Sequence, residues 1–206
     1  MKRLQRLTLC SLLALPLVAL AQSAPKDTTE SAPVVSAMDE VLFYQLLLAE
    51  INQNQGDLAE AYALYMDAAN KTKDARLYQR AVEMAQRARE GSATLQAARA
   101  WKAAEPQSME ANRQLFQTLL SLNQIGETLT PLRDELARQS GEARALFITQ
   151  IPRLYARVSD KSAATRLVET ALANELSNPQ NAATAWSTIG RMRLNANNLA
   201  GAQEAA

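Results

Sequence analysis

The sequence predicts an all-α protein built from repeated antiparallel helix pairs, and three observations carry this prediction. Good helix formers, mainly Ala, Leu, Gln, Glu and Arg, dominate nearly every window after residue 40. Aromatic residues make up only 5% of the 206 residues, and no run of alternating β-branched and aromatic residues indicates a strand. Small residues recur inside the expected helices at intervals of about one or two repeat lengths, where one repeat is a helix pair of roughly 34 residues.

The first 21 residues have the three parts of a secretory signal peptide. Three basic residues precede an apolar stretch over residues 7–20, and Ala19 and Ala21 stand at the small-residue positions before the cleavage site. The stretch is too short for a membrane span. We therefore predict cutting after Ala21, export to the periplasm, and a mature chain without a transmembrane span.

Cys10, the only cysteine of the chain, lies inside this apolar stretch. The lipidated cysteine of a lipoprotein follows a small residue and closes the apolar core, whereas Leu9 precedes Cys10 and most of the core follows it. We interpret Cys10 as part of the signal peptide. The mature chain then has no thiol, which suits an oxidising compartment, and association with the outer membrane stays open.

Residues 22–38 form a leader whose composition cannot support a core. The stretch "QSAPKDTTESAPVVSA" is rich in Ser, Thr, Ala and Pro and contains few large apolar groups. Such a segment buries too little apolar surface to fold by itself. We predict a flexible leader between the signal peptide and a helical region over residues 39–206.

Composition also excludes several functional classes. The chain contains no His, so it cannot build a Ser-His-Asp triad, a Cys-His pair or a His-ligated metal site. We therefore predict no enzyme activity and no catalytic, cofactor-binding or metal-binding residue. The predicted signal peptide holds three of the 22 basic residues and none of the 21 acidic ones. Its removal leaves the mature chain with a net charge of about −2. Its dispersed basic residues do not favour a nucleic-acid partner.

The end of the chain provides the repeat pattern for the helical region. It contains Trp186-x2-Ile189-Gly190-x2-Arg193, followed by Ala202. This arrangement resembles the tetratricopeptide (TPR) pattern W-x2-L-G-x2-Y…A, with Arg193 in place of the aromatic residue. In such a unit the small residues let helix A and helix B approach closely, and the large residues fill the space to the next unit.

The same pattern occurs three times upstream, with a small-large-small series in each expected helix B. Helix A of the first two units carries Leu48-Ala49 and Met84-Ala85, and the turns are expected at Gly56-Asp57 and Gly91-Ser92. The helix B series are Ala61-x3-Tyr65-x2-Ala68, Ala97-x3-Trp101-x2-Ala104 and Ala164-x3-Val168-x2-Ala171.

The spacing of the small helix B residues reveals one further, degenerate unit. They fall at positions 61, 97, 164 and 202, and the middle interval is about two periods of the roughly 34-residue repeat. A unit must therefore centre near residue 131, where Thr130-Pro131 predicts a helix N-cap and first turn. The five expected units lie near 42–74, 75–107, 108–141, 142–179 and 180–206.

Two places depart from a regular array. Pro152 falls inside the expected helix A of the fourth unit, so we expect a break or kink over residues 150–152, with Leu154, Tyr155 and Val158 continuing the apolar stripe. The chain also stops within helix B of the fifth unit, before that helix has closed its apolar face. We therefore expect a truncated fifth repeat and a longer natural protein.

Residues 46–106, especially "LLLAEINQNQGDLAEAYALYMDAANKTKDARLYQRAVEMA" followed by "AARAWKAAEPQSMEANRQLFQTLLSLNQ", are similar to the N-terminal half of exported proteobacterial TPR proteins. This group includes adaptor lipoproteins that recruit a carboxyl-terminal processing protease to cell-wall hydrolases. The chain departs from those adaptors in lacking a lipidation cysteine. The resemblance implies a TPR-type α-solenoid that acts as a protein-protein interaction scaffold, with a periplasmic protease or cell-wall hydrolase among its candidate partners.

The resemblance also implies which residues bind. In TPR proteins helix A of each unit lines a concave groove that accepts a segment of the partner. By register, the implied groove residues are Phe43, Leu46, Glu50, Gln53 and Asn54 in the first unit, Gln79, Val82, Gln86, Arg89 and Glu90 in the second, and Thr184, Ser187, Arg191 and Asn195 in the last.

Two other functions remain open from the sequence. A TPR component of cell-envelope assembly or polysaccharide export differs from an adaptor only in the partner that it holds. An enzyme would have to perform acid-base chemistry with carboxylates alone. The candidate acid-base residues are Glu50 and Asp57. Both acids stand in repeat-like contexts that already account for them.

Overall fold

The structure is a computed structural model that describes residues 40–205, and every regular element in this range is helical. By internal contacts the chain separates into Met1–Ala37 and Met38–Ala206, and all described helices belong to the second unit. The predicted signal peptide and the predicted leader over 22–38 lie outside the described residues. The predictions for those segments therefore stay predictions.

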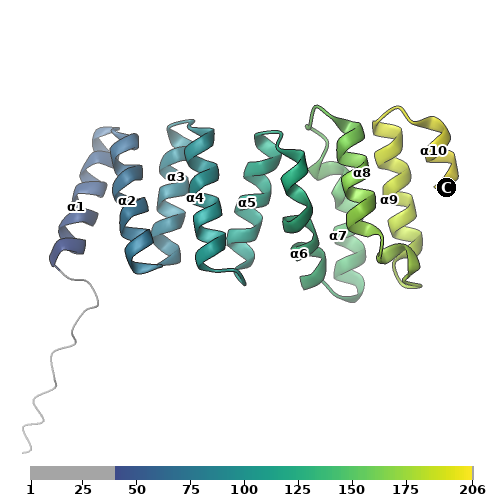
Figure 1. Ribbon diagram of the computed structural model, residues 1–206, viewed down its shortest axis with the longest axis horizontal. Helices are drawn as coiled ribbons and strands as arrows, with labels where there is room; N and C mark the ends of the chain where they lie inside the picture. Colours follow the sequence, from purple (N-terminus) through teal and green to yellow (C-terminus); the bar gives the residue numbers. More distant parts are fainter. Residues whose placement is uncertain (1–39, 206) are drawn as a thin grey trace, which may run out of the picture. The chain divides into compact units, whose positions relative to one another are not determined.

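Ten α-helices follow one another in residues 40–205 as five consecutive pairs (Figure 1). Two short 3-10 helices, η1 (Ile125–Thr128) and η2 (Glu175–Ser177), precede α6 and α9. The pairs are α1 (Glu40–Gln55) with α2 (Leu58–Thr72), α3 (Ala75–Arg87) with α4 (Gly91–Ala104), α5 (Met109–Ser121) with α6 (Leu129–Arg138), α7 (Gly141–Leu154) with α8 (Lys161–Leu172), and α9 (Ala182–Asn195) with α10 (Leu199–Glu204).

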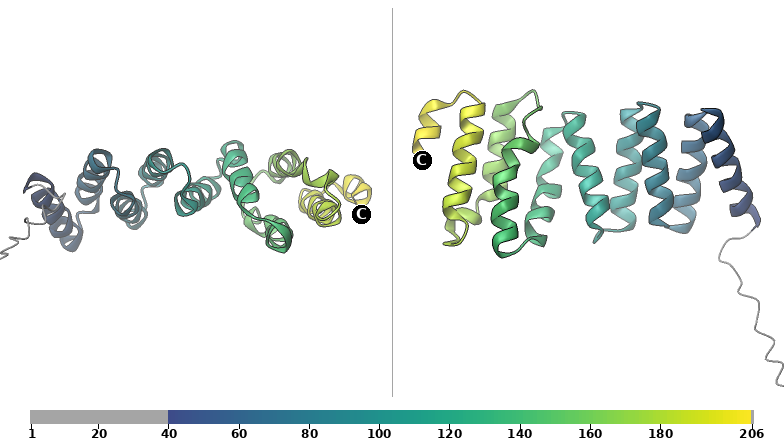
Figure 2. Two further views of the ribbon diagram at one scale, coloured as in Figure 1. Left: turned by 90° about the horizontal axis from the view of Figure 1, so that it is seen from below. Right: turned by 180° about the vertical axis from the view of Figure 1, so that it is seen from behind.

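Neighbouring helices run in opposite directions, and from α1 to α5 each helix packs on the next one along the chain. Seen nearly end-on, these helices alternate between two rows (Figure 2). Farther along, α7 packs chiefly on α9, while α8 packs on α6, α9 and η1. The predicted fold class is confirmed: the described part of the chain is an all-α, TPR-type solenoid of antiparallel helix pairs.

Small residues allow this close helix packing. Ala61, Ala97 and Ala164, the predicted small residues of α2, α4 and α8, have no exposed surface. Ala49 and Ala85 are also buried, in the facing helices α1 and α3. Because a larger side chain in a closely packed core forces neighbouring groups apart, the alanines of α1 to α4 set the distance between the helices of the first two pairs. Ala164 allows close packing of α8 on its own neighbours, which are α6, α9 and η1.

Polar side chains mark where five of the helices begin. Each accepts a hydrogen bond from a backbone N–H of the first helical turn, which has no partner within the helix. These N-cap residues are Asp57, Asp74, Ser108, Asp160 and Asn198.

The first predicted turn is confirmed, and the second is displaced. Gly56 has a φ of +87°, a conformation that glycine adopts without steric cost, directly before the N-cap Asp57. The second turn lies at Ala88 and Arg89 rather than at Gly91-Ser92, because Gly91 is the first residue of α4. A Cβ at Gly91 would lie 2.6 Å from Leu122 Cδ2, so a larger residue there would require the Leu122 side chain to move.

The degenerate third pair is joined by a buried amide instead of a small residue. Asn112 of α5, which has no exposed surface, donates from Nδ2 to the Pro131 carbonyl at 3.0 Å and to Glu135 Oε1 at 2.7 Å. The predicted N-cap at Thr130 is wrong, since α6 begins at Leu129 directly after η1. Pro131 is nevertheless tolerated in the first turn, where a backbone N–H has no acceptor within the helix.

The apolar core consists of two clusters that meet in α5. The first runs from Ala49 to Ala111, and the second begins with Phe116 and continues to Ala205. Tyr155 lies at the centre of the second cluster: its hydroxyl donates to Thr128 Oγ1 at 2.7 Å, while Thr128 donates to the Ile125 carbonyl. Its ring packs edge-on against Phe116, with ring centroids 6.0 Å apart.

The sequence predicts a break or kink over residues 150–152, and the break is wrong, because α7 continues through Pro152 and ends at Leu154. Proline has no N–H to donate to the carbonyl four residues earlier, which belongs to Ile148. The Thr188 hydroxyl of α9 donates to this carbonyl at 3.1 Å in a buried position. Tyr155 and Val158 continue the apolar stripe as expected, whereas Leu154 is partly exposed.

We expect Thr188→Val to lower the free energy of unfolding by about 1–3 kcal/mol, because the buried Ile148 carbonyl loses its donor. In a protein that already carries Pro152→Ala, Thr188→Val should lower the free energy of unfolding by about 1 kcal/mol less. The introduced alanine supplies a backbone N–H to the Ile148 carbonyl in place of the Thr188 hydroxyl. Urea unfolding followed by circular dichroism of the four variants measures this coupling. Strictly additive effects would contradict the role of Thr188.

Burial raises the pKa of Tyr155 to about 12. The neutral phenol therefore stabilises the folded state fully below about pH 10, the pKa of tyrosine in an unfolded chain, and this stabilisation is lost as the pH rises toward 12. Over this range we expect the wild type to lose about 2–3 kcal/mol more stability than Tyr155→Phe. Urea unfolding at stepped alkaline pH measures the difference, and parallel curves for the two proteins would refute it.

Candidate functional site

The face of α3 and α5 contains a polar hollow of about 310 Å³, which we call the amide notch. The end of α3, the first turn of α4 and the second half of α5 form its walls. Its lining residues are Gln86, Arg89, Gly91, Thr94, Gln114, Gln117, Thr118, Ser121 and Leu122. Two of the predicted groove residues, Gln86 and Arg89, thus lie together in one hollow.

The side chains of the notch fall into two groups by their hydrogen bonds. The hydroxyls of Thr94, Thr118 and Ser121 donate to backbone carbonyls of their own helices or helix ends. In contrast, the side chains of Gln86, Arg89 and Gln117 have no hydrogen bond or ion pair with any described residue, and all three are exposed. The notch therefore presents two unoccupied amides and one cation to a ligand.

This set of groups is suited to binding a peptide rather than to chemistry on it. A glutamine amide can donate to a main-chain carbonyl and accept from a main-chain N–H. Arg89 can bind a carboxylate, and the lining contains no acidic side chain that would neutralise it. None of the three hydroxyls has a neighbouring base that could activate it as a nucleophile.

The sequence prediction missed the half of the notch that α5 provides. Gln114, Gln117 and Ser121 are three and four residues apart, so they share one face of the helix. The third unit has no small marker residue in helix B, and without that marker no groove register could be assigned to its helix A. The spacing of the polar residues in "NRQLFQTLLS" is the signal that could have located them.

The predicted groove residues of the first unit lie in different environments. Phe43 and Asn54 are exposed, whereas Leu46 packs against the first core cluster. Gln53 is half-buried, and its Oε1 has no hydrogen-bond partner within residues 40–205. Glu50 accepts from the Tyr65 hydroxyl at 2.6 Å and lies 3.7 Å from Arg80, so it joins three helices.

The remaining predicted residues of the second unit divide by burial. Gln79 is exposed on the same face of α3 as Gln86, one heptad earlier. Val82 is only 3% exposed and belongs to the first core cluster, so a partner cannot contact it without rearrangement of the helix. Glu90 is exposed at the N-cap of α4, where its backbone carbonyl accepts from Thr94.

Three predicted residues of the last unit line two other hollows. Ser187 and Arg191 lie in a hollow of about 620 Å³ between α9 and α10, which also contains the partly exposed Trp186 and Leu194. Asn195 lies in an open hollow of about 470 Å³ with residues 159–162. Thr184 is half-buried near the start of α9. The structure thus does not gather the predicted residues into one site.

The two carboxylates considered for an enzyme both have structural roles. The Tyr65 hydroxyl donates to Glu50, and burial together with this bond raises the pKa of Tyr65. Asp57 caps α2 by accepting from the backbone N–H of Glu60 at 3.4 Å. Among residues 40–205, no group of three or more acidic side chains is arranged to hold a metal ion.

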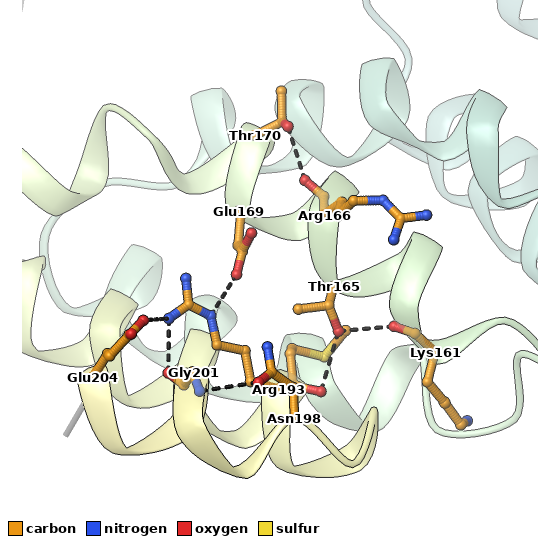
Figure 3. Close-up of polar contacts among 10 residues, drawn as sticks. Lys161, Thr165, Arg166, Glu169, Thr170, Arg193, Asn198, Gly201 and Glu204 are labelled. Atoms are coloured by element: carbon orange, nitrogen blue, oxygen red, sulfur yellow. Dashed lines mark hydrogen bonds and ion pairs between the residues drawn. The ribbon is translucent and has the colours of Figure 1, made fainter.

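Arg193, which stands in place of the expected aromatic residue, joins α8, α9 and α10 (Figure 3). It donates from Nε to Glu169 Oε1 and from Nη1 to the Gly201 carbonyl, both at 2.7 Å. Nη1 also lies 3.6 Å from Glu204 Oε2. A guanidinium can bridge several acceptors in this way, so Arg193 holds the last helix pair together by hydrogen bonds rather than by ring packing.

Comparisons with known proteins give only general likenesses. No family model matches the chain, and no curated protein matches it. Solved structures that resemble it include PilW, a widely conserved type IV pilus biogenesis factor, with 20% sequence identity, coverage of 81% of this chain and 75% of that chain, and a TM-score of 0.41. MamA protein has 11% identity, coverage of 81% of this chain and 88% of that chain, and a TM-score of 0.46. A tetratricopeptide repeat protein from Parabacteroides merdae ATCC 43184 has 12% identity, coverage of 80% of this chain and 62% of that chain, and a TM-score of 0.43. Likenesses at these identities and scores indicate neither a partner nor a cellular location.

None of the helices within residues 40–205 has the length and apolar character that crossing a bilayer requires.

We expect Arg193→Met to lower the free energy of unfolding by about 1–3 kcal/mol, because the partly buried Glu169 loses its charged donor. The neighbouring Arg191 is exposed and makes no ion pair with a described residue, so Arg191→Met is the matched control and should cost less than about 0.5 kcal/mol. Urea unfolding measures both values. Equal losses for the two variants would show that the Arg193 bonds do not stabilise the last pair.

Proposed function

We propose that this protein is a non-enzymatic adaptor of the periplasm that binds an extended segment of a partner protein in the amide notch. The observation that carries the proposal is the set of unoccupied groups on α3 and α5, the amides of Gln86 and Gln117 and the guanidinium of Arg89. A TPR-type solenoid supports the general role, because its repeated helices present extended binding surfaces. The predicted signal peptide is the support for the location.

The chemistry of the notch specifies what the bound segment must offer. Two neutral amides, one on α3 and one on α5, can bind the N–H and C=O groups of an extended main chain without requiring a particular sequence. Arg89 at the edge favours a segment with an Asp, a Glu or a terminal carboxylate near the amides. The absence of acidic groups from the lining means that a negatively charged segment meets no repulsion inside the notch.

A periplasmic protease or cell-wall hydrolase is the partner class that the resemblance to exported TPR adaptors favours. An enzyme held this way would be brought to its substrate by the solenoid, which itself performs no chemistry. The notch does not distinguish such a partner from a component of cell-envelope assembly or polysaccharide export. The partner recovered in the following experiment decides between these classes.

We expect the chain from residue 22 onward to retain specific partners from a periplasmic extract, and the triple variant Gln86→Ala, Arg89→Ala, Gln117→Ala to lose them. Loss of two amide contacts and one charged contact should weaken binding by about 10- to 100-fold. Mass spectrometry identifies the retained proteins. Binding of the recovered partner to both proteins is then quantified by calorimetry.

The matched control is the triple variant Gln107→Ala, Arg166→Ala, Gln203→Ala, which removes the same side-chain types from exposed positions outside the notch. None of these three side chains makes a hydrogen bond or ion pair with a described residue. The control should bind the partner like the wild type. Equal affinity of the notch variant and the control would reject the notch as the binding site.

A further inference from the structure

Helix α1 exposes a row of large apolar side chains along its outer face, and this row has no role in the notch. Val41, Tyr44, Leu47 and Ile51 are 70%, 61%, 45% and 41% exposed. Their spacing of three, three and four residues places them on one side of the helix, and we call them the α1 stripe. Continuous apolar surface of this kind marks an interaction site more often than scattered apolar residues do.

The opposite face of α1 is already occupied by its own pair. Ala49 has no exposed surface, and the largely buried Gln45 donates from Nε2 to the Leu64 carbonyl and to Asp67 of α2 at 2.8 and 2.9 Å. Leu46 packs beside Ala49 against the first core cluster, so this side of α1 is already engaged. The α1 stripe is not engaged in this way, and covering it would remove four large side chains from water.

We propose that a second copy of this chain covers the α1 stripe, with the two α1 helices antiparallel about a two-fold axis near Leu47. A two-fold interface uses the same patch on both copies, so the patch must complement itself. The α1 stripe meets this condition, because Leu47 lies at its middle, with Tyr44 one turn before it and Ile51 one turn after it. Antiparallel pairing places Tyr44 of each copy beside Ile51 of the other.

The charges of α1 are compatible with this pairing. The stripe contains no ionisable side chain except Tyr44, and the only charged residues of α1 are Glu40 and Glu50. Glu50 is engaged with Tyr65 and Arg80. Antiparallel pairing brings Glu40 of one copy toward the amides of Asn54 and Gln55 of the other, and like charges do not meet. The stripe also lacks the charged groups by which an interface commonly selects a different protein.

The size of the stripe predicts a weak dimer. At 1.5 Å per residue the 16 residues of α1 extend about 24 Å. One aromatic and three aliphatic side chains per copy, with Phe43 at the edge, give a buried area on the order of 1,000 Å² over both copies, which is the lower limit for a specific interface. We therefore expect a dissociation constant in the micromolar range, so that dimers form at high concentration and dissociate on dilution.

The test is sedimentation equilibrium of the chain from residue 22 onward at concentrations between about 1 µM and about 500 µM. We expect a concentration-dependent monomer-dimer equilibrium for the wild type. Leu47→Glu and Leu47→Lys should each weaken the dimer by about 100-fold or more, because each places an unpaired charge at the two-fold axis. Leu146→Glu, at a 55% exposed leucine of α7, is the matched control and should dimerise like the wild type.

An equal mixture of Leu47→Glu and Leu47→Lys tests the geometry. Two-fold pairing brings the introduced glutamate of one copy next to the introduced lysine of the other, so the mixture should dimerise again although neither variant does so alone. Leu47 is exposed, and circular dichroism should show unchanged helicity for both variants. A monomeric wild type at every concentration, a dimer that Leu47→Glu leaves intact, or a mixture that stays monomeric would each overturn the proposal.

Discussion

The rest of the solenoid depends on the close approach of neighbouring helices, which buried alanines make possible. Ala61, Ala97 and Ala164 have no exposed surface, and each lies where a larger side chain would push two helices apart. Large side chains such as Tyr65 and Trp101 then fill the space beside them. Because the notch is formed by side chains of three consecutive helices, its width depends on the same distances.

The third pair shows a different solution to the same problem. It has no fully buried alanine in α6, and its helices are joined by the bonds of Asn112 to the Pro131 carbonyl and to Glu135. A buried amide N–H costs free energy unless it is hydrogen-bonded, so the two bonds of Asn112 Nδ2 favour one register between α5 and α6. The Oδ1 of Asn112 has no hydrogen-bond partner within residues 40–205. A similar substitution occurs in the last unit, where the hydrogen bonds of Arg193 replace the packing of an aromatic ring.

The sequence was sufficient to predict the fold class, because alanine periodicity and turn residues are local signals. It was insufficient wherever a contact joins residues far apart in the chain. Pro152 indicated a break, and only the Thr188 hydroxyl, which comes from α9, explains why the helix continues. Gly91 resembled a turn residue, whereas it begins α4 and lies against the Leu122 side chain at the end of α5.

The candidate site was predictable to the extent that the repeat register was clear. Gln86 and Arg89 were assigned from the second unit, and they lie in the notch. Val82 received the same assignment from its register, but its side chain turns into the core. Gln117 was missed because the third unit lacks the alanine that defines the register, so half of the notch had no sequence marker.

The division of the apolar core inside α5 has a consequence for how the array comes apart. Ala111, near the start of this helix, belongs to the first cluster, and Phe116, near its middle, belongs to the second. In a repeat array stability is the sum of local terms and nearest-neighbour interfaces, so the weakest junction separates cooperative blocks. We therefore expect one half to be able to open while the other stays folded, with α5 as the junction between the two folding blocks. A ligand held jointly by α3 and α5 would bridge that joint and make the two blocks melt as one.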